Sequence, residues 1–91
     1  MTNQSFTAKQ GQYLAFIHAY IQLLGRAPAE TDMQRYFRVS PPSVHQMILT
    51  LERRGLISRR PRVARSIVLK VSPDLVPPLA PQASQSPVPP S

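Results

Sequence analysis

Prolines crowd the C-terminal end of this chain. Seven of the last 19 residues are proline, and only one residue among them, Asp74, is charged. A segment of this composition cannot fill a hydrophobic core, so we expect residues 72–91 to be disordered, with local polyproline-II character and no secondary structure. The foldable part of the chain then shrinks to about 65 residues. A domain of that size buries only roughly 60% of the surface of its unfolded chain, which makes a large active-site cleft improbable.

The chain contains no cysteine and only two histidines, His18 and His45. These counts exclude a disulfide framework and a thiolate metal site, and two isolated histidines are too few to hold a zinc ion. No apolar run follows a basic N-terminal segment, and no stretch of about 18 apolar residues occurs. We therefore expect a cytoplasmic protein with no membrane partner, no metal and no small-molecule cofactor.

Positive charge dominates the sequence. Eleven Lys and Arg against four Asp and Glu give a formal net charge of +7. Nine of these eleven are arginine, whose planar guanidinium pairs with phosphate and with the edge of guanine. Seven basic residues lie between Arg53 and Lys70, a span with no acidic residue. A basic domain of this size most often binds nucleic acid.

A first helix is predicted from Ala8 to a C-terminal Gly25, because Thr7 and Gln10 form a capping-box pattern. Its core stripe at helical spacing consists of Leu14, Ile17, Ile21 and Leu24. Four further side chains, Tyr13, Phe16, Tyr20 and Leu23, widen the apolar arc to roughly 180°, more than a surface helix needs. The apolar side chains beyond the core stripe either belong to the core or form a homodimer contact through Phe16, Tyr20 and Leu23.

A second, shorter helix is predicted over residues 29–37, after the turn that Pro28 ends. Glu30 and Asp32 fall in its first turn, where the helix dipole favours negative charge. Its buried face is predicted to consist of Met33, Tyr36 and Phe37.

The sequence "VSPPSVHQM" (residues 39–47) marks the start of a third helix. Ser40 is a favourable N-cap, and proline is tolerated in the first helical turn, where backbone N–H groups have no intrahelical partner. Val44, Met47, Ile48 and Leu51 then repeat at helical spacing, and Gly55 ends the helix. The face turned away from the core carries mostly small or hydrogen-bonding side chains near its N-terminal end.

Two short strands are predicted next, at residues 56–58 and 66–71, joined by "RRPRVAR". Ile67, Leu69 and Val71 alternate with Val68 and Lys70, as in a hairpin with one buried face. Two strands alone are marginally stable, so we expect them to pack on the helices.

Three helices followed by a hairpin form the element order of a winged helix-turn-helix domain over residues 7–71, after a flexible N-terminus of residues 1–6. In such a domain the helix after the turn enters the DNA major groove with its N-terminal residues nearest the base edges. Small side chains at the tip allow a close approach, and the helix N-terminus attracts phosphate.

The chain resembles the N-terminal DNA-binding domain of the LexA repressor family, which is bacterial. The resemblance covers about residues 5–71 and is carried by "FTAKQGQYLAFIHAYIQLLGRAP", "FRVSPPSVHQMILTLERRGLI" and "ARSIVL". It implies a base-reading face at Pro42, Ser43, His45 and Gln46, with Ser40 available to a phosphate. With the basic residues of the third helix and the hairpin loop, the predicted DNA-contacting set is Ser40, Pro41, Pro42, Ser43, His45, Gln46, Arg53, Arg59, Arg60, Arg62 and Arg65.

Three departures from the family pattern stand out. The family commonly has an Asn and two Glu where this chain has Pro42, His45 and Gln46, which implies a different operator half-site. Arg38 occupies the turn where many helix-turn-helix proteins place glycine. No lysine follows Lys70, so we expect the self-cleaving serine–lysine protease domain of LexA repressors, and the dimerisation it provides, to be absent.

Other interpretations remain open. Residues 40–46 could be an ordinary solvated helix start, and the arginines at 59, 60, 62 and 65 a solubilising surface. If five phosphates were neutralised, log K would fall with log salt at a slope of about −4.5. Of Arg53 and Arg54, we expect one to reach a phosphate and the other to pair with Glu52.

The main alternative function is a winged-helix protein–protein interaction module. RNA binding lacks an aromatic platform, and no catalytic constellation can be assembled.

Overall fold

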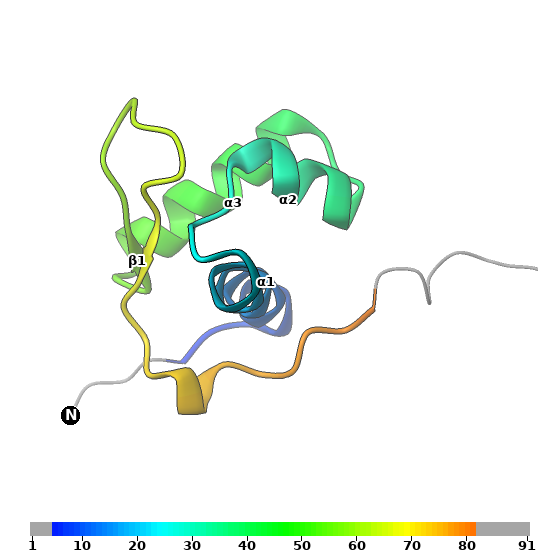
Figure 1. The fold of residues 1–91 in the computed structure, drawn as a ribbon, viewed down its shortest axis with the longest axis vertical. Helices are drawn as coiled ribbons and strands as arrows, with labels where there is room; N and C mark the ends of the chain where they lie inside the picture. Colours follow the sequence, from blue (N-terminus) through cyan, green and yellow to red (C-terminus); the bar gives the residue numbers. More distant parts are fainter. Residues whose placement is uncertain (1–4, 82–91) are drawn as a thin grey trace, which may run out of the picture.

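The computed structural model of the protein describes residues 5–81 and forms three helices and an antiparallel hairpin (Figure 1). The helices are α1 (Ala8–Leu24), α2 (Glu30–Phe37) and α3 (Pro41–Arg53). The strands are β1 (Ile57–Ser58) and β2 (Val68–Leu69), and a 3-10 helix, η1 (Pro73–Leu75), follows them. The predicted fold class, a mainly helical winged helix-turn-helix, is confirmed.

The helix ends form for the reasons that the sequence indicates. Thr7 Oγ1 accepts a hydrogen bond from the Gln10 amide at 3.0 Å, and Gln10 Oε1 accepts one from the Thr7 amide at 3.0 Å, which is a complete capping box. Gly25 ends α1 at φ 74°, in the left-handed region that glycine adopts without strain. Ser40 caps α3, and Pro41 and Pro42 begin it.

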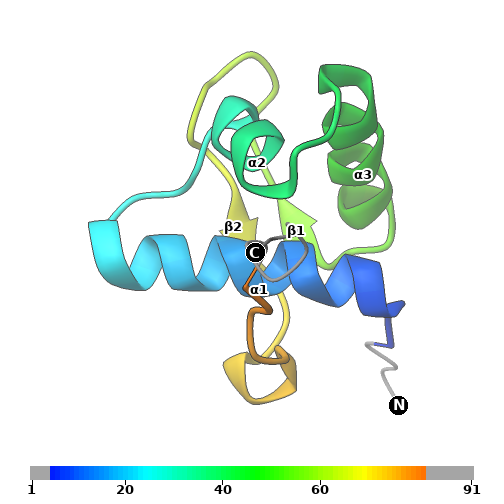
Figure 2. The same cartoon turned by 90° about the vertical axis from the view of Figure 1, so that its right-hand side faces the viewer.

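The core lies where α1 crosses beneath α2, α3 and the hairpin (Figure 2). Its centre is fully buried and consists of Leu14, Ile17, Met33, Val44, Ile48 and Leu51. One predicted core residue is wrong: Leu24 is 55% exposed. The last turn of α1 extends beyond the elements packed on it, so helical spacing alone overestimates how far the buried stripe continues (Figure 2).

The widened apolar arc of α1 is mostly an aromatic part of the core. Phe16 is only 8% exposed, and its ring centroid lies 4.8 Å from that of Tyr36 and 5.7 Å from that of Phe37. Tyr13 stacks on Phe37 with centroids 4.2 Å apart. The suggested dimer contact is therefore wrong for Phe16, which has no surface to offer a second chain, whereas Leu23 is 82% exposed.

The hairpin pairs Ile57 with Leu69 and Ser58 with Val68. Its inner face is buried at Ile57, Ile67 and Val71, whereas Val68 on the outer face is 55% exposed. The alternation predicted for residues 67–71 is confirmed. The nine residues between the strands, 59–67, form the wing loop.

The first ten residues beyond Val71 correct the expectation of a disordered tail. After η1, which lies on the side of α1 away from α3, residues 76–81 cross α1 toward α2 (Figures 1 and 2). The Gln12 side chain donates to Pro78 O at 3.0 Å and accepts from the Ala80 amide at 2.7 Å, and Tyr36 Oη donates to Ala80 O at 2.9 Å. Proline prevents this segment from joining a sheet or helix, but its carbonyl oxygens still accept hydrogen bonds.

The apolar contacts of this segment explain a buried glycine in α1. A Cβ atom at Gly11 would lie 3.0 Å from Cγ of Pro77 and 3.1 Å from Cε1 of Phe6, so any larger residue would push both side chains away by a few tenths of an ångström. Phe6 also packs against the core, which corrects the expectation that residues 1–6 are flexible at that position. Residues 1–4 and 82–91, to which the same expectations applied, lie outside the described residues. None of the described helices combines the length and apolarity that a membrane crossing requires.

Candidate nucleic-acid interface

The turn between α2 and α3 forms without glycine. Arg38 adopts a left-handed conformation, φ 57° and ψ 49°, and its amide donates to Gln34 O. The Val39 amide also donates to Gln34 O, at 3.3 Å. Arg38 thus takes the backbone conformation that glycine commonly supplies, and α3 follows α2 after a tight turn.

The tip of α3 is exposed at Ser40, Pro41, Pro42 and Ser43. Ser40 Oγ accepts from the Ser43 amide at 3.3 Å and lies 3.0 Å from Ser43 Oγ. Pro41 and Pro42 have no N–H group, and the Ser43 N–H is already bonded. This tip therefore offers DNA its serine hydroxyls, one of which already donates to the other, and the backbone of residues 41–43 has no N–H group available to a phosphate.

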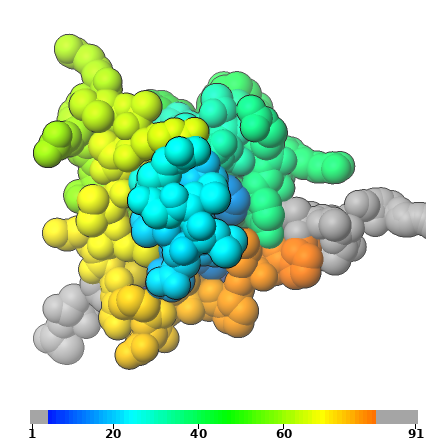
Figure 3. Space-filling model, viewed as in Figure 1, coloured from blue at the N-terminus to red at the C-terminus, as the bar shows by residue number. Residues whose placement is uncertain are grey.

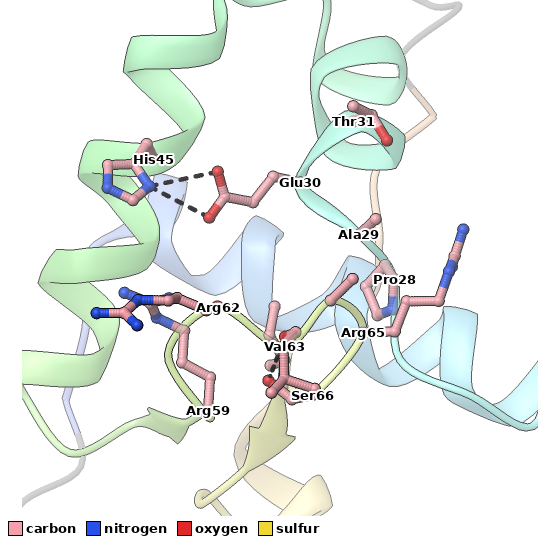
Figure 4. A pocket seen from close by; sticks show the side chains of 12 residues that line it. Pro28, Ala29, Glu30, Thr31, His45, Arg59, Arg62, Val63, Arg65 and Ser66 are labelled. Carbon is pink, nitrogen blue, oxygen red and sulfur yellow. Dashed lines mark hydrogen bonds and ion pairs between the residues drawn. The ribbon is translucent and has the colours of Figure 1, made fainter.

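The second turn of α3 exposes His45 and Gln46 on the same outer face. Val44 and Ile48, which alternate with them around the helix, are fully buried. His45 Nδ1 lies 3.2 Å from Oε2 and 3.3 Å from Oε1 of Glu30, at the start of α2 (Figure 4). The structure therefore brings the predicted base-reading residues together on one exposed face.

The four wing-loop arginines divide into two pairs with different surroundings. Arg59 Nε donates to Glu52 Oε1 at 3.1 Å, and its side chain is only 19% exposed. Arg65 Nη1 donates to Tyr20 Oη at 3.0 Å, to Ala27 O at 3.3 Å and to Asp32 Oδ2 at 3.1 Å. These two arginines attach the wing loop to the helices, a structural role that the sequence did not predict for Arg59 and Arg65.

Arg60 and Arg62 form the second pair and are exposed. Within residues 5–81, their guanidinium groups form no ion pair. The loop that carries them is shaped by Ser66, whose hydroxyl accepts from the Arg60 amide at 2.9 Å and donates to Val63 O at 2.8 Å. In the space-filling view the wing loop projects from one corner of the molecule (Figure 3).

The basic residues at the end of α3 differ from the expectation. Arg54 Nη2 donates to Ser5 O at 3.0 Å, and Arg53 Nη2 donates to Thr50 Oγ1 at 3.4 Å. Neither pairs with Glu52, whose Oε1 accepts from Arg59 instead. Arg53 is exposed on the same helix as the candidate base-reading residues.

A groove of about 340 Å³ separates α3 from the wing loop (Figure 4). Its walls include His45 of α3, Glu30 at the start of α2, and Arg59, Arg62 and Ser66 of the wing loop. Because the groove lies between α3 and the wing loop, these two elements can contact different parts of a duplex. No three His, Cys, Asp or Glu side chains of the described residues are grouped as a metal site would need.

Asp32 connects α2 to the wing loop and caps its own helix. Its Oδ2 accepts from the Ala29 amide at 2.9 Å as well as from Arg65. Burial alone would raise the pKa of this carboxyl. The hydrogen bonds from Ala29 and Tyr20 and the charge of Arg65 outweigh burial and lower the pKa below its ordinary value.

Sequence reasoning placed Glu30 and Asp32 only as favourable charges at a helix start. Their cross-element partners, His45 and Arg65, are 15 and 33 residues away in the chain. No local pattern signals contacts of that separation. The packing of α2 against α3 and against the wing loop creates both.

Comparisons with known proteins agree with this geometry. Residues 3–66 match the family pattern of the LexA DNA binding domain. The LexA repressor of Thermosipho africanus (strain TCF52B) is 37% identical over 73 residues, which are 80% of this chain and 37% of that protein. The LexA repressor of Thermosipho melanesiensis (strain DSM 12029 / CIP 104789 / BI429) is 38% identical over 66 residues, 72% of this chain and 33% of that protein. The chain thus matches only about a third of the length of these relatives.

Proposed function

This chain belongs to the family of LexA DNA-binding domains, and from that premise we propose that it binds double-stranded DNA sequence-specifically as a repressor-like transcriptional regulator. One observation carries the proposal. The outer face of α3 is exposed at residues 40–43, 45 and 46, while its inner residues Val44, Ile48 and Leu51 are fully buried. A helix whose inner face is packed in the core and whose outer face carries exposed polar side chains is suited to the major groove.

The proposed mechanism is occupancy of an operator, with no chemical step. Pro42, Ser43, His45 and Gln46 face the base edges, and the Gln46 amide is able to bond adenine bidentately. Arg60 and Arg62 contact the sugar–phosphate backbone beside the groove, and Arg53 contacts a phosphate at the far end of α3. A regulator of this kind acts in the cytoplasm, on the nucleoid.

A two-fold operator would require two copies of the chain. Of the surface considered for that contact, Phe16 is buried and Tyr20 is bonded to Arg65. Leu23 remains, at 82% exposure, together with its neighbour Leu24. We propose that two copies assemble on DNA. Sedimentation of the protein bound to a labelled duplex measures that stoichiometry.

Substitution of the two exposed wing-loop arginines tests the proposal. Binding to a labelled random duplex at low salt should weaken at least tenfold in the Arg60→Glu, Arg62→Glu double variant, because two phosphate contacts are lost and repulsion replaces them. With Arg53, Arg60 and Arg62 as the phosphate contacts, the salt slope of the wild type should be about −2.7 per bound copy, since each contact contributes about −0.9. Anisotropy titrations at several salt concentrations give both quantities.

Lys9→Glu is the control for charge away from the interface, and because it reverses one charge where the double variant reverses two, the losses are compared per reversed charge. Lys9 lies in the first turn of α1, three helical turns from Tyr20, where the wing loop is attached. A glutamate there is favourable for the helix dipole, so folding should not suffer. Equal losses in the control and in the double variant would indicate nonspecific attraction. Absence of binding by the wild type would contradict the proposal and favour the protein–protein interaction module, for which the exposed Leu23 and Leu24 offer a surface.

A further inference from the structure

The contact between His45 and Glu30 links the candidate base-reading helix to the helix before it. Both carboxylate oxygens of Glu30 lie within 3.3 Å of His45 Nδ1. The histidine side chain is 52% exposed and the glutamate side chain 34%. An ion pair or hydrogen bond this exposed adds little to folding stability, so its main physical effect is on the orientation and hydrogen placement of the ring.

The chemistry of the two groups determines which ring nitrogen carries the hydrogen. An ionised carboxylate only accepts hydrogen bonds, so Nδ1 must be the donor. In the neutral ring, Nε2 then has no hydrogen and is an acceptor. Nε2 lies on the side of the ring turned away from Glu30 (Figure 4).

We propose that Glu30 is a positioning residue that fixes His45 as a hydrogen-bond acceptor toward DNA, and that His45 thereby selects a base with an amino group in the major groove. This inference rests on the proposed function. The bases that present such a donor are cytosine, through N4, and adenine, through N6. Guanine and thymine present acceptors at the corresponding positions, which would face the Nε2 lone pair unfavourably.

Gln46 cannot supply the same discrimination. Its side-chain amide carries both a donor and an acceptor, and it can present either to a base. Arg59 and Arg62 line the same groove as the His45–Glu30 pair, and both are donors only. Besides Glu30 itself, whose carboxylate also only accepts, the neutral Nδ1–H form of His45 is the side chain among these groove residues and Gln46 that offers DNA an acceptor alone.

Nitrogen NMR of the free protein tests the first half of the inference. At about pH 8, where an ordinary imidazole is neutral, the ¹⁵N shifts of His45 should report the Nδ1–H form. In Glu30→Ala the ring should change to the Nε2–H form that unconstrained histidines favour. His18 in α1 is the internal control, and its spectrum should stay unchanged. An Nε2–H ring in the wild type would overturn the inference, whatever the DNA binding.

Selection of bound sequences from a random duplex library tests the second half. The wild type should prefer adenine or cytosine about five- to tenfold at one position of the selected site, as one hydrogen bond to a base supplies. His45→Ala and Glu30→Ala should both lose that preference and keep the preferences at other positions. Asp74→Asn removes one negative charge from η1, on the far side of α1, and should keep all preferences (Figure 2).

The outcomes separate the inference from the proposed function. Removal of a carboxylate near DNA will raise overall affinity, so affinity alone does not decide. If Glu30→Ala binds duplex and retains the base preference at every position, the positioning role is wrong and the DNA-binding function stands. If the wild type binds no duplex, the proposed function fails, and the base-reading role of His45 fails with it.

Discussion

Arg38 adopts a left-handed backbone conformation, which residues other than glycine rarely adopt. Its φ of 57° brings Cβ close to the neighbouring backbone, which costs about 1–2 kcal/mol for an L-residue. The turn forms nevertheless, because α2 and α3 pack on one core and fix the direction in which the chain must reverse. The strain is therefore stored locally and is balanced by the packing on either side.

Arg38→Gly should raise the free energy of unfolding by about 0.5–1 kcal/mol. Relief of the strain exceeds the entropy that glycine adds to the unfolded chain. Arg35→Gly, at an exposed position in the last turn of α2, should lower it by about 1 kcal/mol, since glycine weakens the helix and removes a basic side chain that the helix dipole favours there. Urea unfolding of the two variants checks the opposite signs, and a loss of stability in both would refute the assignment of strain to Arg38.

Asp32 makes the stability of the protein depend on pH in the acid range. Its pKa is lower in the folded than in the unfolded chain, so its contribution is fully present above the unfolded pKa of about 3.9. The contribution decreases as the pH falls below that value and is lost once the pH passes the lower, folded pKa. The carboxylate form alone can hold Arg65 and the Ala29 amide in the geometry described above.

Asp32→Asn should therefore be less stable than the wild type by about 1–2 kcal/mol at neutral pH, and the difference should narrow below about pH 4. Thermal or urea unfolding of both proteins across the acid range measures it. Asp74→Asn, which alters an exposed carboxyl of η1, is the matched control and should follow the wild-type curve. If the two proteins differed in stability by the same amount at every pH, Asp32 would act through the shape of its side chain and not through its charge.

At the scale of elements, α1 is covered on two sides. The core lies on one side, and residues 76–81 cover a further part of the helix surface, where they are bonded to Gln12 and to Tyr36 of the aromatic cluster. Val76 and Leu79 add partly buried apolar surface to this attachment. In a domain with so few residues, a second covering for the longest helix is a substantial addition to the core.

Truncation after Val71 should lower the free energy of unfolding by about 1–3 kcal/mol, since two partly buried apolar side chains and three hydrogen bonds are lost. A chain ending at Pro81 keeps each of these contacts and is the matched control. Urea unfolding of both forms measures the difference. If the chain ending at Val71 is as stable as the control, the contacts along α1 contribute nothing to folding.

On the scale of the whole molecule, α3 and the wing loop lie on the opposite side of α1 from η1 (Figure 2). Arg65 bonds the wing loop to α1 and α2, and Arg59 bonds it to α3. These contacts fix the position of Arg60 and Arg62 relative to the tip of α3. The wing loop and α3 can therefore meet a duplex as one rigid surface, which reduces the ordering entropy of binding.

The helices, the hairpin and their order follow from the sequence, because caps, prolines and apolar periodicity act over only a few residues. Ser40, Pro41 and Pro42 specify where α3 begins, and the alternation from Ile67 to Val71 specifies which face of the hairpin is buried. Such signals do not depend on the rest of the chain. The tip of α3 and its exposed face were predictable for the same reason.

Only the tertiary structure decided which charged residues pair with one another. Arg59, Arg60, Arg62 and Arg65 look alike in the sequence, yet two of them are bound to carboxylates that other elements bring to them. The composition of residues 72–81 likewise predicts disorder, because it shows only how much apolar surface a segment can bury by itself. Their hydrogen bonds come from Gln12 and Tyr36, more than 40 residues away. Contacts over such separations depend on the packing of the whole chain, which no local pattern encodes.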